Sequence, residues 1–229
     1  MIGIENVEVF GWEAAIRGMR NPMNSWEKSD SGTLYGRFVV GKNDYELMQK
    51  LVNAGNDHSK FMRMINVTCD ITAPLYWWKE YDTYKVGTVA NSCSTMHKIH
   101  DKEFELSDFS CEKLISIAQD IFESVTVTGF DERVCCAPLN ILEDWIIPSL
   151  NMCRAQYIET KDKNYWWQMI QLLPTSYNQK RTVQLNYAVL RNMYHSRKNH
   201  KLDEWRYFCE WIEGLPYSYL ITMKTGGVE

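Results

Sequence analysis

The 229-residue sequence lacks the patterns that mark most metalloproteins and disulfide-linked proteins. Its seven cysteines include no Cys-x-x-Cys pair, and Cys135 and Cys136 are adjacent, so a bridge between them would be strained. Its five histidines include no His-Glu-x-x-His motif, and His195 and His200 are poorly spaced to share a metal on one helix. These absences predict no metal site, histidines at the surface, and reduced thiols in a cytoplasmic protein.

The sequence also has no excess of positive charge and no long apolar run. With 25 basic and 29 acidic residues its formal net charge is -4, which gives no reason to expect nucleic acid as a partner. One local basic stretch, Arg191 to Lys201, could still bind a phosphate group. No apolar run approaches the roughly 18 residues of a membrane span, and no signal-peptide pattern opens the sequence. Without repeats, low-complexity tracts or linkers, residues 1–229 are predicted to form one domain that does not associate with membranes.

Aromatic residues and alternating segments are abundant. Nine tryptophans and thirteen tyrosines supply material for a core or for subunit contacts. Near-alternation of apolar and polar residues predicts a strand over Met64 to Thr72, which Pro74 ends. Shorter strands are predicted over Val7–Phe10 and Val183–Leu185, and a polar loop over Ser25–Gly41. Helices are predicted where apolar residues recur at helical spacing: 12–20, 43–55 with a capping box of Asn43 and Glu46, 110–122, 140–157 with a kink at Pro148, 163–173, 187–197 and 202–213. This order of elements is typical of an α+β or α/β fold.

Two polar segments about a hundred residues apart could together build a pocket for an anionic ligand. The first, residues 71–98, follows the alternating strand through an aromatic helix, and the second, residues 173–200, is a Leu-Pro loop followed by a helix with Asn and Arg. Arg197 has a planar guanidinium that can grip a base edge or a phosphate through two hydrogen bonds. Asn186 and Asn192 offer a donor and an acceptor each. Cys93 has no identifiable partner base and is not predicted to be a nucleophile.

The order of these segments resembles the flavin-dependent thymidylate synthases. Asn186, Asn192 and Arg197 keep the spacing of that family's late Asn, Asn and Arg, and Trp205 falls near its Gln-Trp-Glu. Ala14-Ala-Ile-Arg17 is similar to its early Ala-Arg helix, and Asp57-His58-Ser59-Lys60-Phe61 to its His-Glu-Thr/Ser-Pro-Phe turn. The resemblance spans roughly residues 5–210. It implies a single-domain α+β fold with a central sheet flanked by helices.

The family's central signature is altered in this sequence. Its Arg-His-Arg is Thr83-Tyr84-Lys85, and the preceding Arg-Gln is Lys79-Glu80. Its Asn-Glu is Asn91-Ser92 with one residue inserted before it, and Ile170 stands where an Arg is expected. Lys85 keeps a positive charge, whereas Thr83 and Tyr84 offer only neutral donors, which bind phosphate more weakly than charged ones. Glu80 would repel a phosphate, so it either pairs with Lys79 or Arg197 or indicates a different ligand.

The resemblance implies methylation of dUMP, or of another pyrimidine nucleotide, by a homotetramer with FAD as cofactor and with methylenetetrahydrofolate and NADPH as co-substrates. Arg197 would stabilise negative charge that develops on the pyrimidine ring. The implied cofactor-binding residues are Ser59, Thr83, Tyr84, Lys85, Asn91, Asn186 and Asn192. The implied substrate-binding residues are Glu80, Ser94 and Arg197.

Other interpretations of the same residues remain open. The chain could be a scaffold that binds a nucleotide or a flavin but has lost catalysis, which the loss of Arg-His-Arg favours. It could also run related flavin chemistry on another pyrimidine nucleotide. Residue by residue, Arg197 could be a solvated arginine at a helix end, Asn186 a helix N-cap, Asn192 a solvent-facing residue, and Ser59 a loop or cap serine.

Overall fold

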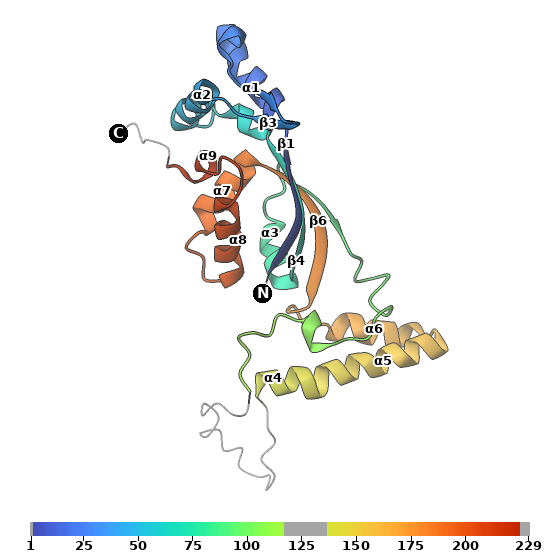
Figure 1. Ribbon diagram of the computed structural model, residues 1–229. Coiled ribbons are helices and arrows are strands. Elements are labelled where there is room, and N and C mark those ends of the chain that lie inside the picture. Colours follow the sequence, from blue (N-terminus) through green and yellow to red (C-terminus); the bar gives the residue numbers. More distant parts are fainter. Residues whose placement is uncertain (1, 117–136, 225–229) are drawn as a thin grey trace. The chain divides into compact units, whose positions relative to one another are not determined.

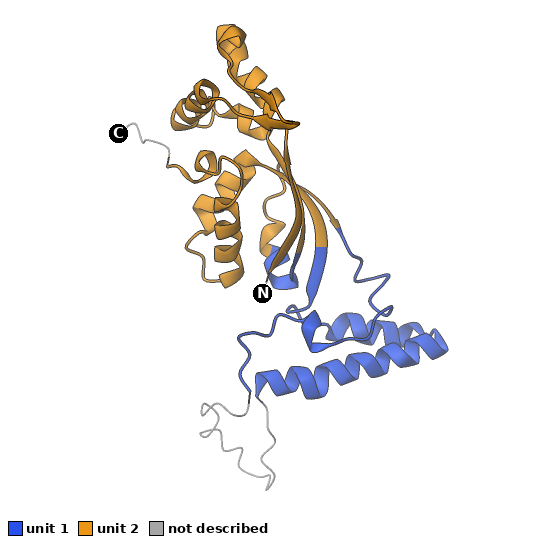
Figure 2. Cartoon of the chain, in the orientation of Figure 1, with its two compact units in different colours: residues 1, 72–79, 92–180 blue, residues 2–71, 80–91, 181–229 orange. Residues whose placement is uncertain are grey.

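The computed structural model describes residues 2–116 and 137–224, which form a mixed fold of a sheet flanked by helices. The described residues divide into two compact units (Figure 2). Unit 1 holds residues 72–79, 92–116 and 137–180, and unit 2 holds residues 2–71, 80–91 and 181–224. The predicted α+β class is confirmed. No helix in the described ranges is long and apolar enough to cross a membrane.

A four-stranded sheet runs in the order β1-β4-β6-β5 (Figure 1). Its strands are β1 Gly3–Phe10, β4 Asn66–Pro74, β6 Asn178–Asn186 and β5 Val89–Ser92. The predicted strand over Met64–Thr72 corresponds to β4, and its buried residues alternate with half-buried ones. This alternation places Val67, Cys69 and Ile71 in the core. The predicted strands over 7–10 and 183–185 are the ends of β1 and β6, whereas β5 was not expected.

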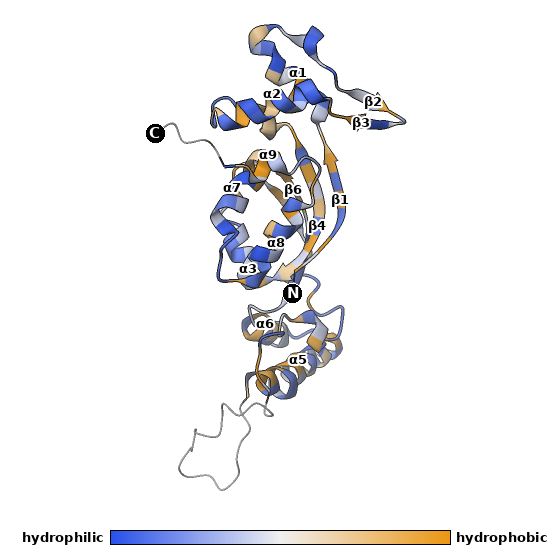
Figure 3. Cartoon of the chain, turned by 60° about the vertical axis from the view of Figure 1, so that its left-hand side comes forward, coloured by the Kyte–Doolittle hydropathy of each residue, from blue (hydrophilic) through white to orange (hydrophobic). Residues whose placement is uncertain are grey.

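Polar residues alternate with the buried ones along β4, and the colour changes along this strand in Figure 3 follow that alternation. Asp70 on β4 accepts a hydrogen bond from Asn6 Nδ2 at 2.9 Å and another from Thr182 Oγ1 at 2.6 Å. Gln184 Nε2 donates to Asn66 Oδ1 at 3.3 Å along the same face. These cross-strand pairs join β1, β4 and β6 and fix which face of β4 is turned to the core.

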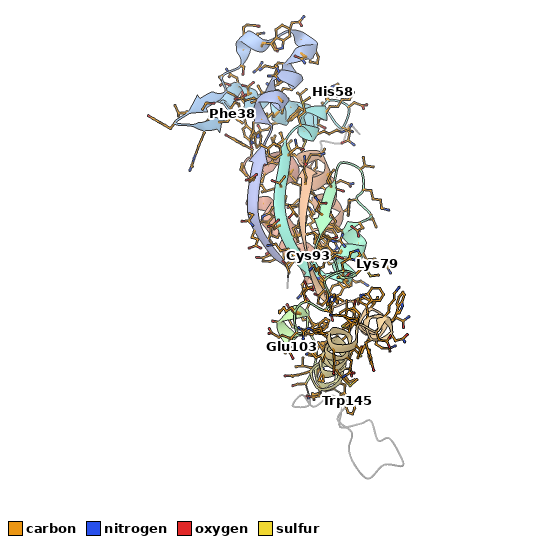
Figure 4. All side chains as sticks on the ribbon, turned by 90° about the vertical axis from the view of Figure 1, so that its right-hand side faces the viewer. Phe38, His58, Lys79, Cys93, Glu103 and Trp145 are labelled. Carbon is orange, nitrogen blue, oxygen red and sulfur yellow. The ribbon has the colours of Figure 1, made fainter. Side chains whose placement is uncertain are left out.

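Helices cover the apolar face of this sheet in unit 2, where α7 and α8 lie against it in Figures 1 and 4. The helix α7 also contacts α8, α9 and the 3₁₀ helix η3. The predicted helices over 12–20 and 187–197 are confirmed to the residue, and that over 202–213 to within one residue. The elements are α1 Trp12–Arg20, α2 Lys42–Asn53, η3 Lys60–Arg63, α7 Tyr187–Arg197, α8 Asp203–Glu213 and α9 Tyr219–Thr222.

The segment predicted as a loop over Ser25–Gly41 contains a hairpin, so that prediction was wrong in part. The short strands β2 Gly32–Leu34 and β3 Arg37–Val39 pair antiparallel, with Thr33 opposite Phe38. Tyr35 and Gly36 link them with φ of 50° and 75°, the conformation of a two-residue hairpin turn. Figure 4 labels Phe38 on this hairpin. Two 3₁₀ helices, η1 Asn21–Met23 and η2 Trp26–Lys28, precede it.

A buried ion pair ties the end of α1 to α2, and Ser29 and Ser31 of this segment donate hydrogen bonds to the same carboxylate. Arg20 Nε donates to Asp44 Oδ1 at 2.6 Å, and the two side chains are 5% and 0% exposed. Burial opposes ionisation of Asp44, but hydrogen bonds from Ser31, Ser29 and Arg20 outweigh it and lower the pKa of this carboxyl below its ordinary value. The carboxylate therefore organises the segment before α2 around one buried charge.

The predicted capping box of α2 is not present. The backbone N–H groups of Asn43 and Asp44 donate instead to Asp30 Oδ2 and Oδ1, at 2.9 and 3.1 Å. The capping carboxylate thus comes from a residue more than ten positions earlier in the chain, and Gly41 stands at the N-cap position without a side chain of its own.

Unit 1 has its own apolar core beneath a pair of helices. The helix α4 Pro138–Asn140 continues through a π-helical turn, η6 Ile141–Ile146, into α5 Ile147–Thr160, and α6 Lys163–Leu172 packs on α5. Pro148 lies in the first turn of α5, directly after the π-helical turn. A proline has no N–H to donate to the preceding turn, and the change of helix type at this point accommodates it. The core residues are Ile99, Phe104, Phe109, Leu142, Ile147, Leu150, Cys153 and Met169.

Two other segments complete unit 1. The helix α3 Leu75–Tyr81 begins here directly after Pro74, as predicted, and Trp78 Nε1 donates to the carbonyl oxygen of Gln179 at 2.8 Å. Residues 110–116 form turns after the 3₁₀ helix η4 Leu106–Asp108, so the predicted helix over 110–122 is wrong for these residues. Its remainder, like Cys135 and Cys136, lies outside the described residues.

Candidate functional site

Asn186 precedes α7 in unit 2, and its side chain contacts both this helix and the loop before β5. Its side-chain Oδ1 accepts a hydrogen bond from the N–H of Val189 at 3.0 Å, which is an N-cap. Its Nδ2 approaches the carbonyl oxygen of Gly87 at 3.5 Å. The N-cap interpretation of Asn186 is confirmed. The amide links the start of α7 to the loop between α3 and β5.

Gly87 has to be a glycine for this link to form. Its φ is +80°, and a Cβ at this position would lie 2.8 Å from Asn186 Nδ2 and 3.0 Å from Val189 Cγ2. A larger residue would be strained in its backbone and would push the loop away from α7. The loop that carries Thr83, Tyr84 and Lys85 is thereby held close to the start of the Asn/Arg helix.

Arg197, at the end of α7, is the centre of a hydrogen-bonded cluster with Glu80 and Tyr84. Its Nε donates to Tyr84 Oη at 2.8 Å, and its Nη1 donates to Glu80 Oε2 at 2.8 Å. Trp205 Nε1 donates to the same Glu80 oxygen at 2.9 Å. His200 Nε2 lies 3.0 Å from Arg197 Nη1 and 3.4 Å from Glu80 Oε2. Of the two partners considered for Glu80, Lys79 and Arg197, the structure shows an ion pair with Arg197.

Two aromatic rings hold the guanidinium in place. The Cζ atom of Arg197 lies 4.9 Å from the centre of the Trp205 ring and 5.5 Å from that of Tyr84. The side chains of Arg197 and Glu80 are 20% and 34% exposed, so the pair is neither solvated nor fully buried. Cation–π contact and partial burial both strengthen an interaction of this kind. Arg197 is not the solvated arginine of the alternative interpretation.

The cluster leaves some hydrogen-bonding capacity unused. Within residues 2–116 and 137–224, Arg197 Nη2 and Glu80 Oε1 make no hydrogen bond to another residue. Tyr84 Oη accepts from Arg197, and its own hydrogen stays available for donation. A ligand could thus meet a charged donor, a charged acceptor and a neutral donor in one place.

A cavity of ≈ 300 Å³ adjoins the altered signature in unit 2 and is lined by Tyr81, Asp82, Lys85, Thr88 and Ala90. Arg181 Nη1 donates to Asp82 Oδ1 at 2.8 Å, which neutralises that carboxylate. Lys85 is exposed and has no ion pair or hydrogen bond within the described part of the chain. This cation fits a phosphate group of a nucleotide or of FAD, whereas the Thr88 hydroxyl donates its hydrogen to the carbonyl oxygen of Tyr84 at 2.6 Å. The volume is at the lower end for ligand pockets, so an entire dinucleotide would extend beyond it.

The other predicted site residues lie outside the Arg197 cluster and do not line this cavity. Thr83 is exposed and its hydroxyl donates to the carbonyl oxygen of Glu80 at 2.7 Å, at the end of α3. Asn91 on β5 and Asn192 on α7 are exposed, as the solvent-facing interpretation of Asn192 expected. Ser59 is buried beside η3, with Oγ 3.5 Å from the carbonyl oxygen of Asn56. Ser94 belongs to unit 1 and accepts a hydrogen bond from the N–H of His97 at 3.0 Å.

Some functional contacts were missed from the sequence. His200 was expected at the surface, but its ring contacts Arg197, three positions earlier in the chain. This short separation in sequence is the feature from which the contact could have been predicted. Arg191 donates to the carbonyl oxygens of Leu220 and Ile221 at 3.1 and 2.9 Å and so anchors α9. Burial lowers the pKa of Arg191, and burial together with the nearby Arg191 charge lowers that of His195. Arg191 and His195 are therefore held against α9 and the residues beside it, and do not contribute to a free basic surface for phosphate.

No group of three or more residues among those the structure describes could hold a metal ion. A second cavity, of ≈ 350 Å³, is lined in part by Ile16, Arg17, Trp26 and Phe38 and contains none of the predicted site residues. The charged and hydrogen-bonding groups of the predicted site therefore lie around Arg197 and Lys85. They amount to charged and neutral hydrogen-bond donors with one carboxylate, which suit a nucleotide better than a metal ion.

Comparison with known proteins identifies the fold. No family model matches the sequence, and no curated protein matches it. Among solved structures, a flavin-dependent thymidylate synthase ThyX from Helicobacter pylori, complexed with FAD and dUMP, is 18% identical. That match covers 95% of this chain and 98% of the other, with a TM-score of 0.64. Another H. pylori ThyX structure with FAD and dUMP is 16% identical over 96% of each chain, with a TM-score of 0.62.

The same fold occurs in an enzyme with a related activity. The UMP/dUMP methylase PolB from Streptomyces cacaoi, bound with 5-Br dUMP, is 14% identical, with 96% of this chain and 94% of that chain covered and a TM-score of 0.57. Nearly the whole length of each chain is aligned in all of these matches, so the likeness is not confined to a common substructure. The chain has the fold of the flavin-dependent thymidylate synthases, as its polar segments predicted.

Proposed function

We propose that this chain is a flavin-dependent enzyme that transfers a one-carbon group to a pyrimidine nucleotide, dUMP or a close relative. The observation that carries the proposal is the cluster of Arg197, Glu80 and Tyr84 on a fold whose solved examples hold dUMP or a dUMP analogue. Bound FAD would supply the hydride chemistry, with methylenetetrahydrofolate as the carbon donor and NADPH as the reductant. A homotetramer is the assembly that we propose with this function.

The chain's own residues have separate tasks in this proposal. Arg197 would bind and orient the pyrimidine, and its positive charge would stabilise negative charge on the ring. Trp205 and Tyr84 keep the guanidinium in place, and partial burial makes its charge more effective than in water. Lys85 would bind phosphate at the cavity. Asn186, Asn192, Ser59, Thr83 and Asn91 remain candidates for flavin contacts and Ser94 for a substrate contact.

A second candidate function is a nucleotide- or flavin-binding protein that has lost catalysis. Two observations favour it. The Oδ1 of Asn186 caps α7 and its Nδ2 approaches the carbonyl oxygen of Gly87, and Thr83 and Tyr84 give no positive charge where the resembling family has an arginine and a histidine. FAD binding is accordingly expected to be weaker than in that family, because neutral hydrogen bonds to phosphate are about half as strong as charge-assisted ones.

Titration of the apo-protein with FAD, followed by flavin fluorescence, tests the cofactor. We expect saturable quenching at micromolar FAD. Formation of a methylated nucleotide from dUMP and from other pyrimidine nucleotides, with methylenetetrahydrofolate and NADPH present and mass spectrometry as the readout, then separates the two candidates. Saturable FAD and nucleotide binding without any methylated product would establish the binding protein. No FAD response at high micromolar concentrations would reject the enzyme.

A further inference from the structure

The continuous helix of unit 1 that runs from α4 through η6 into α5 exposes a line of apolar side chains. The residues on its inner side, Leu142, Ile147, Leu150 and Cys153, belong to the core of the unit. On its outer side an apolar residue recurs at alternating steps of four and three positions. This exposed stripe consists of Ile141, Trp145, Pro148, Met152 and Ala155.

The spacing of the exposed stripe is that of a helix packed along a second helix. Alternating steps of three and four residues place side chains on one narrow line, as in a coiled-coil seam. The described residues of the chain leave this line uncovered, because Trp145 and Met152 are 65% and 62% exposed. Figure 4 labels Trp145 on this helix. Large apolar side chains gathered in this way at a surface mark a site of association.

Side-chain size along the exposed stripe suits a second copy of the same helix in the antiparallel direction. Trp145 is the bulkiest member, and Ala155, ten positions later, is the smallest. In an antiparallel pair each Trp145 can lie against Ala155 of the second copy, with Pro148 and Met152 of the two copies between these contacts. In a parallel pair the two Trp145 rings would occupy the same level, and so would the two small Ala155 side chains.

Charge beside the exposed stripe favours the same direction. Glu143 and Asp144 precede Trp145, whereas Arg154 precedes Ala155. The Arg154 Nε and Nη2 atoms donate to the carbonyl oxygens of His100 and Asp101, and its Nη1 makes no hydrogen bond within the described ranges. An antiparallel pair therefore brings the two carboxylates of each copy to the end where the other copy has a guanidinium. A parallel pair would instead bring like charges together.

We propose that two copies of this chain associate through the exposed stripe, with their α4–η6–α5 helices antiparallel about a twofold axis near the middle of the stripe. Such an interface is isologous, so the same residues serve both copies. The proposal locates one interface of the homotetramer but does not depend on which ligand the chain binds. A single helix pair buries less surface than a standard interface of about 1,600 Å², so a dissociation constant in the micromolar range is expected for this contact.

Sedimentation velocity of the full-length chain, from low to high micromolar concentration, tests the surface. We expect a species of at least twice the 27.0 kDa mass of one chain. Trp145→Glu removes the largest contact and places a charge in the seam, and it should raise the dissociation constant about 10-fold or more. Trp167→Glu is the matched control, because it makes the same change at a 42% exposed tryptophan of α6 outside the stripe. Met152→Glu replaces Trp145→Glu if circular dichroism shows that the latter does not fold.

Cysteine cross-linking tests the direction. Trp145→Cys protein is mixed with Ala155→Cys protein and oxidised, and mass spectrometry of peptides identifies the bridges. The antiparallel pair predicts a disulfide between positions 145 and 155 in the mixture, and none at 145 or at 155 in either variant alone. A mixed pair keeps one Trp145 and one Ala155 opposite each other, so it retains half of the contact under test.

Each outcome decides a different question. A wild-type chain that stays monomeric overturns the proposal, and so does association that Trp145→Glu does not weaken more than Trp167→Glu. Cross-linking of position 145 to itself overturns the antiparallel arrangement. A monomer that binds FAD and methylates a nucleotide overturns the proposal and leaves the enzymatic function standing. Association through the stripe in a chain that binds no FAD rejects the enzyme and leaves the proposal standing.

Discussion

Replacing Arg197 by alanine should affect nucleotide binding and stability by different amounts. The substitution removes the hydrogen bonds to Tyr84 and Glu80 and the contact with the Trp205 ring. An exposed ion pair is worth about 0–1 kcal/mol, and breaking a buried one costs about 3–5 kcal/mol. With side chains 20% and 34% exposed, this pair lies between those limits but nearer the exposed one. We expect the free energy of unfolding to fall by about 1–2 kcal/mol.

The expected loss in nucleotide binding is larger. A charged hydrogen-bond partner removed from a desolvated site costs about 2–4 kcal/mol, equivalent to about 30- to 1000-fold in affinity. Arg197→Lys keeps the charge but cannot reach Tyr84 and Glu80 and stack on Trp205 at once, so its loss should be intermediate. Isothermal titration with dUMP and dCMP measures the affinities, and urea denaturation measures the stability.

Lys201→Ala is the control, because Lys201 is exposed and makes no ion pair or hydrogen bond within the described part of the chain. Arg191→Ala is unsuitable, since Arg191 anchors α9. The reasoning would be refuted if Arg197→Ala lost the expected stability but bound nucleotide within about 3-fold of Lys201→Ala. Arg197 would then be a structural residue, and the spacing shared with the resembling family would carry no functional meaning.

Three further variants test other parts of the structure. Asn186→Ala should lower the free energy of unfolding by about 1–2 kcal/mol in urea, whereas Asn186→Ser should retain most of it, because serine can also cap α7. Asp44→Asn should cost about 3–5 kcal/mol, since it leaves Arg20 buried without its counter-charge. The pKa of Asp44 is lowered in the folded state. Its contribution to the free energy of unfolding is therefore present above the unfolded pKa of about 3.9 and is lost as the pH falls through the folded pKa. An acid denaturation curve that is the same in Asp44→Asn as in the wild-type chain would contradict this. Thr83→Arg restores a positive charge beside Lys85 and should tighten FAD binding several-fold in the fluorescence titration, and no change would remove this loop from the cofactor site.

The helices whose signals are local were predicted well. The helix α7 was placed from Tyr187 to Arg197 because Asn186 caps it and its apolar residues recur at helical spacing. The start of α2 shows the limit of this reasoning, because its capping carboxylate belongs to Asp30, outside the helix and its flanking residues. The strand β5 carries only exposed residues, so no alternation marked it. Such elements are fixed by tertiary contacts that a sequence window does not contain.

The candidate site was predictable in its residues but not in its contacts. The resemblance to the family's signature singled out Arg197, Glu80 and Tyr84, which the fold brings into one cluster from segments more than a hundred positions apart. That Arg197 would be held by Tyr84 Oη, and Glu80 by Trp205, depends on how α3, α7 and α8 are placed in unit 2. Side-chain pairing of this kind follows from packing, which no periodicity encodes.

The altered positions of the signature are not independent of one another. Glu80 stands where the resembling family has a glutamine and Tyr84 where it has a histidine, and both accept hydrogen bonds from the one arginine that keeps its place. Loss of function by random substitution would be expected to leave buried or half-buried polar groups of a former site without partners, because nothing selects for their pairing. Arg197 is instead hydrogen-bonded to both Glu80 and Tyr84, while Arg197 Nη2, Glu80 Oε1 and the hydroxyl hydrogen of Tyr84 make no hydrogen bond to another described residue. A paired cluster of this kind is expected both of a site with an altered ligand and of a structural contact, and nucleotide titration of Arg197→Ala distinguishes the two.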